Sequence, residues 1–166
     1  MEERFFAKLE NACEEKQSLL CVGLDPQLEA GESSDPYGAI LGKNRRVIEQ
    51  TLPFACCYKP NIAFYEACGL EGLRALKDTL ELIPEETPVI LDAKRGDIGH
   101  TASAYAEALF SWYKVGCATV SPYLGRESVA PLLARPGKGL FVLCRTSNPQ
   151  AGDLQAMLVG GQGRER

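Results

Sequence analysis

Short, continuously apolar runs alternate along this chain with segments of helical spacing, and this alternation limits the fold more than any other feature. The apolar runs predict strands at 18–24, 54–59, 88–94, 117–121 and 139–144. Helical spacing predicts helices at 5–15, 39–52, 62–83, 101–115 and 127–133, the third with a break near Gly69 or Gly72. Strands that are apolar throughout and joined by helices are typical of a parallel sheet buried on both faces. The sequence therefore predicts an α/β protein with one strand–helix alternation after an amino-terminal helix.

Polar side chains follow most of these predicted strands at the point where each strand ends. These residues are Asp25, Lys59, Asp92 with Lys94, and Thr146 with Ser147. In parallel α/β folds the carboxyl ends of the strands form one rim, and active sites lie there. Aspartate and lysine are rarely buried unless they are paired. Their repetition at one rim predicts a convergent polar site.

The third strand ends in the pattern D-x-K-x-x-D, formed by Asp92, Lys94 and Asp97. Strand alternation places Asp92 and Lys94 on the same face. Two carboxylates beside one ammonium favour its charged form, which makes Lys94 a poor base but a good proton donor. Lys59 on the neighbouring strand could extend the group into a row of alternating charges. A salt-bridge network without catalytic function is the other interpretation.

Composition excludes several classes of protein. The formal net charge of -4 argues against a general nucleic-acid binder, although a small phosphorylated substrate needs only a few local cations. The apolar runs are too short to span a membrane, and the first residues do not have the pattern of a secretory signal. Seven scattered cysteines and the single histidine, His100, do not form a usual zinc motif. We expect buried, reduced thiols, a cytoplasmic protein, and His100 exposed at a helix start.

Four segments together resemble one enzyme family. They are CVGLDP at 21–26, KPNIAFYE at 59–66, LDAKRGDIG at 91–99 and TSNP at 146–149. In this combination they resemble the orotidine 5′-phosphate decarboxylases, in particular the bacterial subfamily with a long loop after the first strand. The resemblance extends over residues 1–158. It implies a TIM (β/α)8 barrel that acts as a homodimer, uses neither metal nor organic cofactor, and converts orotidine 5′-monophosphate to uridine 5′-monophosphate and CO₂.

The resemblance also implies a role for each charged residue at the rim. Lys94 would protonate the pyrimidine carbon that loses CO₂. Asp92 would lie against the departing carboxylate. Lys59 and Asp25 would hold the ribose hydroxyls and complete the charged row.

Five further residues would complete the substrate site by the same resemblance. Asp97, Ile98 and Thr101 would be donated across the dimer interface into the partner's site. Ser147, or alternatively Thr146, would hydrogen-bond the pyrimidine ring. The nucleotide is thus the implied small-molecule partner.

The chain departs from the family in the number of its strands. A TIM barrel has eight βα units and about 250 residues, whereas this sequence predicts about five units in residues 1–158, followed by a disordered tail at 159–166. The phosphate-binding residues of the family would lie beyond residue 166, so we expect an incomplete barrel with little or no decarboxylase activity by itself. Two alternatives remain: a Mg²⁺-dependent sugar-phosphate lyase or aldolase that shares D-x-K-x-x-D, which Lys59 disfavours, and a catalytically inert fragment.

Overall fold

Five short parallel strands form the framework of the computed structural model, which describes residues 4–29 and 34–158. The strands are β1 (Leu20–Leu24), β2 (Ala55–Pro60), β3 (Ile90–Arg95), β4 (Cys117–Val120) and β5 (Gly139–Val142). β1 pairs with β2, and β3, β4 and β5 pair in that order. Isolated parallel bridges, Tyr58 to Val89 and Asn61 to Asp92, join the two groups between β2 and β3. The strands thus follow chain order in an open, partial barrel, as the sequence predicted.

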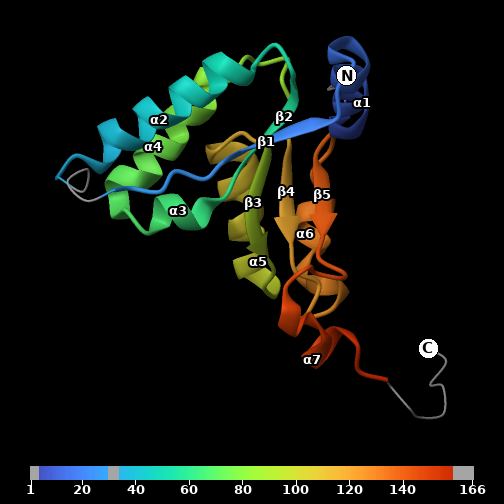
Figure 1. Ribbon diagram of the computed structural model, residues 1–166. Coiled ribbons are helices and arrows are strands. Elements are labelled where there is room, and N and C mark those ends of the chain that lie inside the picture. Colours follow the sequence, from blue (N-terminus) through green and yellow to red (C-terminus); the bar gives the residue numbers. More distant parts are fainter. Residues whose placement is uncertain (1–3, 30–33, 159–166) are drawn as a thin grey trace.

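The helices are α1 (Phe5–Lys16), α2 (Pro36–Thr51), α3 (Ile62–Glu66), α4 (Gly69–Leu82), α5 (Gly99–Glu107), α6 (Ala130–Leu133) and α7 (Gly152–Gln155). Most of them cover the outer side of the strands, whereas α1 lies at the amino ends of the strands and α7 lies beyond the carboxyl end of β5 (Figure 1). α5 continues into a π-helical turn over Ala108–Trp112, and short 3₁₀ turns lie at Arg126–Ser128 and Pro149–Ala151.

Two boundaries show how local chemistry sets the helices. The helix predicted at 39–52 begins three residues earlier, at Pro36, because Asp35 caps it: the Asp35 carboxylate accepts a hydrogen bond from the Gly38 amide at 2.9 Å. The long helical segment 62–83 is broken as predicted, and α4 starts at Gly69, which has a φ of 64°. Glycine tolerates this left-handed conformation without a steric penalty.

The two faces of the central strands pack against different parts of the molecule. Leu91 on β3 and Val120 on β4 are fully buried in a cluster with residues of the surrounding helices, among them Leu76 of α4. Ile90 and Cys117 point to the other face, where they pack against Phe5 of α1. Alternation along β3 therefore places Ile90 and Asp92 on the same inner face of the barrel.

The outer strands are more exposed than the central ones. Within residues 4–29 and 34–158, no strand pairs with the outer side of β1 or of β5. The expectation of buried thiols is therefore wrong for Cys21 on β1 and for Cys144 just after β5, which are both exposed, although it holds for Cys56, Cys57 and Cys117.

Two further predictions concern the carboxyl-terminal residues and membrane-spanning helices. The tail predicted at 159–166 lies outside the described residues, so the domain boundary at 158 stays a prediction. Among the helices that the structure describes, none is long and apolar enough to cross a membrane.

Candidate functional site

A bulge at the end of β3 positions the central residues of the site. β3 and β4 are in register at Leu91 and Ala118, and again at Arg95 and Val120. Three residues of β3 therefore lie opposite a single residue of β4, Thr119. Bulges of this kind bend a strand and redirect its side chains, and they are common beside active sites.

The Thr119 hydroxyl holds this bulge in place. Its Oγ1 accepts hydrogen bonds from two successive backbone amides, that of Ala93 at 3.0 Å and that of Lys94 at 2.9 Å. Lys94 itself has a φ of 46°, in the left-handed region that residues with a side chain seldom adopt. Departures of this kind cost on the order of 1–3 kcal/mol and persist where the surroundings enforce them. The two amide bonds to Thr119 supply that enforcement.

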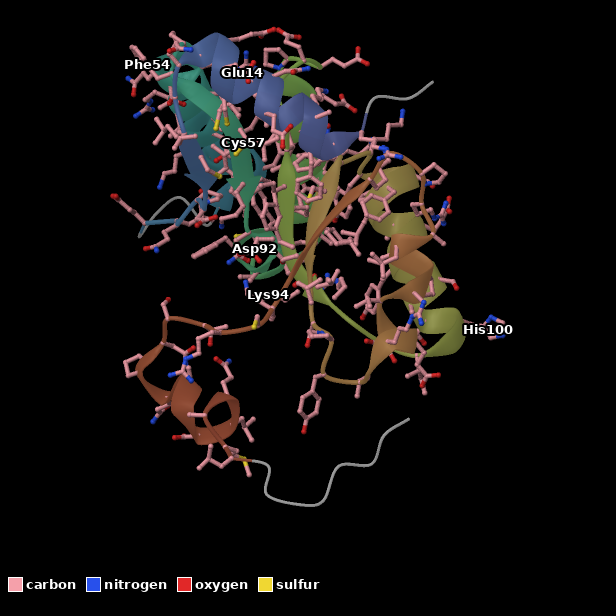
Figure 2. The ribbon with its side chains drawn as sticks, turned by 90° about the vertical axis from the view of Figure 1, so that its right-hand side faces the viewer. Glu14, Phe54, Cys57, Asp92, Lys94 and His100 are labelled. Atoms are coloured by element: carbon pink, nitrogen blue, oxygen red, sulfur yellow. The ribbon has the colours of Figure 1, made fainter. Side chains whose placement is uncertain are left out.

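One carboxylate, that of Asp92, receives three donors at the carboxyl end of the strands. The Lys94 ammonium lies 2.6 Å from Oδ1, the Lys59 ammonium lies 3.4 Å from Oδ2, and the Thr119 hydroxyl donates to Oδ1 at 2.7 Å. The Asp92 side chain is 11% exposed, whereas that of Lys94 is 50% exposed. The predicted row of Lys59, Asp92 and Lys94 is therefore present, with its acid buried and the Lys94 ammonium open to a ligand. Figure 2 shows Asp92 and Lys94 next to each other at this end of the strands.

Opposing effects set the pKa of the Asp92 carboxyl. Burial alone raises this pKa, but the hydrogen bonds from Lys94 and Thr119 and the charges of Lys94 and Lys59 lower it, and the net pKa lies below the ordinary value. Asp92 is therefore an anion at neutral pH. The site presents a fixed negative charge beside an accessible ammonium.

Asp25 lies at the same end of the barrel, next to the end of β2. Its Oδ1 accepts a hydrogen bond from the Asn61 amide at 3.1 Å, and Asn61 forms the bridge to Asp92. The Asp25 side chain is exposed, as the predicted contact with a ligand requires.

Asp97, Ile98 and Thr101 lie beyond the bulge, on the loop after β3 and in the first turn of α5. In the part of the chain that the structure describes, Asp97 forms no ion pair with Lys94; its Oδ1 accepts a hydrogen bond from the Ile98 amide at 2.8 Å. Among the described residues, one carboxylate, that of Asp92, and not the two expected, contacts Lys94. Ile98 is 53% exposed and Thr101 is exposed, so this group faces away from its own protein core.

Thr146 and Ser147 follow β5 and lie in a segment that folds onto α7. The Thr146 hydroxyl donates to Asn148 Oδ1 at 2.7 Å, and the Thr146 amide donates to Gln155 Oε1 at 2.8 Å. Ser147 is exposed. Thr146 is thus engaged in this local turn, and within residues 4–29 and 34–158 no hydrogen bond joins Thr146 or Ser147 to the charged row.

The remaining candidates have simple outcomes. His100 is exposed at the start of α5, as predicted, and it points away from Asp92 and Lys94 (Figure 2). Among residues 4–29 and 34–158, no three or more histidine, cysteine, aspartate or glutamate side chains are grouped to hold a metal ion.

Thr119 is the residue of the site that the sequence prediction missed. Its signal was available: it is the one hydroxyl residue within the apolar strand Cys117–Val120, next to the strand that carries Asp92. A polar group inside an otherwise apolar buried strand needs a partner, and the neighbouring Asp92 is that partner.

The fold and the site together define an α/β-barrel class of protein: the parallel strands form a partial barrel, helices cover its outer face, and a charged row lies at the carboxyl ends of the strands. Comparison with known proteins specifies the family. The family model described as "Orotidine 5'-phosphate decarboxylase / HUMPS family" matches residues 18–165. The chain belongs to this family.

Individual relatives agree with the family model. The chain is 48% identical over 162 residues to the orotidine 5′-phosphate decarboxylase of Thermomicrobium roseum, which covers 96% of this chain and 57% of the relative. The solved structure of Leishmania donovani OMP decarboxylase is 44% identical with a TM-score of 0.85, covering 95% of this chain and 60% of that one. The Leishmania donovani UMP synthase structure is also 44% identical, with a TM-score of 0.87 over 95% of this chain and 34% of that one. The chain thus spans less than two thirds of the length of each of these three relatives.

Proposed function

We propose that this chain carries the proton-donating part of an orotidine 5′-phosphate decarboxylase site, which converts orotidine 5′-monophosphate to uridine 5′-monophosphate and CO₂. The observation that carries the proposal is the contact of two ammonium groups, those of Lys59 and Lys94, with the Asp92 carboxylate. This contact lies at the carboxyl ends of the strands in a chain from this family. The names of the relatives supply the reaction.

Lys94 serves as the acid in this reaction. The bond between the pyrimidine ring and its carboxylate breaks, CO₂ leaves, and the electron pair stays on the ring carbon. The Lys94 ammonium then gives one proton to that carbon and becomes an amine, which water reprotonates. Asp92, an anion 2.6 Å away, favours the charged ammonium before the reaction, and an ammonium already in place stabilises the developing carbanion without reorganisation.

The other residues of the row position the nucleotide. Asp92 lies where it would meet the departing carboxylate, while Lys59 and Asp25 would bind the ribose hydroxyls. The support for these roles is the position of the two residues. Asp25 directly follows β1 and Lys59 lies near the end of β2, which pairs with β1, and the Lys59 ammonium contacts Asp92.

A second copy of the chain would complete the site. Asp97, Ile98 and Thr101 would reach into the partner's site in a homodimer, which agrees with the exposure of Ile98 and with the absence of a pair between Asp97 and Lys94 in the described residues. Ser147, or alternatively Thr146, would hydrogen-bond the pyrimidine ring once the segment after β5 closes over the rim. We place this activity in the cytoplasm and assign it no cofactor.

The second candidate is a metal-dependent sugar-phosphate lyase or aldolase, because the family model covers both kinds of enzyme. Lys59 favours the decarboxylase. Its ammonium lies 3.4 Å from the Asp92 carboxylate, where a cationic side chain competes with a divalent ion for the same oxygen.

Release of labelled CO₂ from carboxyl-labelled orotidine 5′-monophosphate tests the proposal. We would measure it for the 166-residue chain and for a chimera that joins residues 1–158 to the carboxyl-terminal part of the Thermomicrobium roseum relative. We expect turnover by the chimera that a chelator leaves unchanged, and far slower turnover by the chain alone. A well-folded chimera without turnover contradicts the decarboxylase, loss of turnover with the chelator favours the metal-dependent lyase, and equal rates for chain and chimera overturn the expectation of an incomplete site.

A further inference from the structure

Four of the cysteines form one connected group at the amino end of the inner face. Cys13 of α1 packs against the cluster that contains Cys56, Cys56 directly precedes Cys57 in β2, and Cys57 is the register partner of Cys21 in β1. The group runs from a half-buried thiol on α1, through two buried thiols, to the exposed thiol of Cys21. We call it the thiol cluster.

Cys21 and Cys57 are direct neighbours across the β1–β2 pair. The two are Cα partners in the register of the parallel strands. Neighbouring strands lie about 4.8 Å apart, within the range of roughly 4.4–6.8 Å that Cα atoms have across a disulfide. Register partners on paired parallel strands project their side chains to the same face of the sheet, so the Cys21 and Cys57 side chains are neighbours. The backbone already has the spacing that a bond between these sulfurs needs.

The two thiols differ in ways that suit different chemical roles. Interaction with the Cys57 thiol and the nearby charge of Lys59, opposed by burial, lower the pKa of Cys21 to about 7. The same interaction, together with burial, raises the pKa of Cys57 far above its ordinary value. Cys21 is exposed and Cys57 is 3% exposed. Cys21 is thus the accessible nucleophile, and Cys57 is the neutral thiol held beside it.

We propose that Cys21 and Cys57 form a site of reversible oxidation by hydroperoxides. The Cys21 thiolate attacks the terminal peroxide oxygen, the O–O bond breaks, and the leaving hydroxide or alkoxide takes a proton, which leaves a sulfenic acid on Cys21. The Cys57 sulfur then attacks the Cys21 sulfur, the S–O bond breaks, and hydroxide leaves with the Cys57 proton as water. Two thiols and one hydroperoxide give one disulfide, one water and one alcohol, or a second water when the oxidant is hydrogen peroxide.

The position of this disulfide connects it to the charged row. Lys59 is two residues after Cys57 on β2, on the same face, and its charge acts on both Cys21 and Asp92. Oxidation of Cys21 would remove the thiolate charge near Lys59 and would leave the Lys59 contact with Asp92 in place.

Hydrogen peroxide treatment of the purified 166-residue chain tests the proposal, with non-reducing peptide mapping as the readout. We expect loss of two hydrogen atoms in mass, a cross-linked peptide whose fragments join Cys21 to Cys57, and reversal by dithiothreitol. At about pH 7 we also expect Cys21 to react with iodoacetamide roughly tenfold faster than the exposed Cys144, and Lys59→Met to reduce that advantage.

Single substitutions assign the two roles. Cys57→Ser should abolish the cross-link and leave a Cys21 sulfenic acid that dimedone traps, while the matched controls Cys56→Ser and Cys144→Ser should keep the cross-link. If Cys57→Ser fails to fold, the wild-type fragments decide between Cys56 and Cys57. Peroxide treatment that gives no Cys21–Cys57 cross-link, or Cys144 reacting as fast as Cys21, overturns the proposal.

Discussion

The two ends of the same strands differ sharply in chemistry, although they share one inner face. At the amino end of β3, Ile90 packs with Phe5 and Cys117 in an apolar, thiol-rich cluster. Two residues further along the same face, Asp92 is contacted by three donors, two of which are positively charged. The amino ends of the strands pack against α1, whereas the charged side chains lie at the carboxyl ends. The difference shows that strand alternation decides which face a residue occupies, while its position along the strand decides whether it stabilises the fold or serves the site.

Shortening an apolar side chain at the amino end of β3 should have the largest effect on stability. Ile90 is 6% exposed, so Ile90→Ala should lower the free energy of unfolding by about 2–4 kcal/mol, through lost apolar contact and the cavity left behind. Lys94→Ala, at the half-exposed end of the same strand, should cost less than half of that. Urea denaturation followed by circular dichroism measures both; equal losses would mean that the two ends do not divide stability and function.

Loss of the Thr119 hydroxyl should have the next largest effect, because it joins the bulge to the acid. Thr119→Val leaves two backbone amides without their acceptor and removes one of the three donors to Asp92, at a cost of about 1–3 kcal/mol. Thr119→Ser keeps the hydroxyl and is the matched control. The same denaturation experiment decides, and a valine variant as stable as the serine variant would show that the hydroxyl does not hold the bulge.

Acid should weaken the carboxyl end and spare the amino end. The pKa of Asp92 is lowered by folding, so its stabilising contribution is fully present above the ordinary carboxyl pKa of about 3.9 and is lost as pH falls through the lowered value. Asp92→Asn should remove this part of the pH dependence. The difference in unfolding free energy between wild type and variant, measured across acidic pH, should shrink as pH falls; a difference that grows would reverse the sign of the pKa shift.

The smallest of these effects on stability is expected for an ion pair on the surface. Lys77 and Glu81 of α4 lie 3.4 Å apart, one helical turn from each other, with Glu81 67% exposed. Glu81→Gln should change stability by less than about 0.5 kcal/mol, because water and salt screen such pairs. A loss as large as that of Thr119→Val would mean that α4 depends on this pair far more than the buried core suggests.

Most of the framework could be predicted from the sequence because it depends on local patterns. Apolar runs predicted five strands in chain order, and the motif at 91–99 predicted the pair of Asp92 and Lys94. The prediction was less accurate where a residue depends on neighbours far along the chain. Cys21 and Cys144 resemble buried residues in the sequence, yet they lie at outer strands that no described strand covers.

The bulge could not be predicted, since strand periodicity alone continues through it. Regular alternation places Lys94 on the face of Asp92, but the contact depends on a left-handed backbone and on Thr119 of another strand. Asp97 shows the converse case: the spacing suggested a second carboxylate beside Lys94, and the chain direction after Arg95 carries Asp97 away to the start of α5.

The role of Lys94 is tested most directly by the chimera with the Thermomicrobium roseum carboxyl-terminal part, compared with its Lys94→Ala variant and with Lys77→Ala as the matched lysine control. Turnover of orotidine 5′-monophosphate and binding of uridine 5′-monophosphate would be measured on all three proteins. The account predicts that Lys94→Ala lowers turnover by at least about a thousandfold while nucleotide binding largely survives, and that Lys77→Ala changes neither. Turnover retained in Lys94→Ala would contradict a proton donor at the end of the charged row.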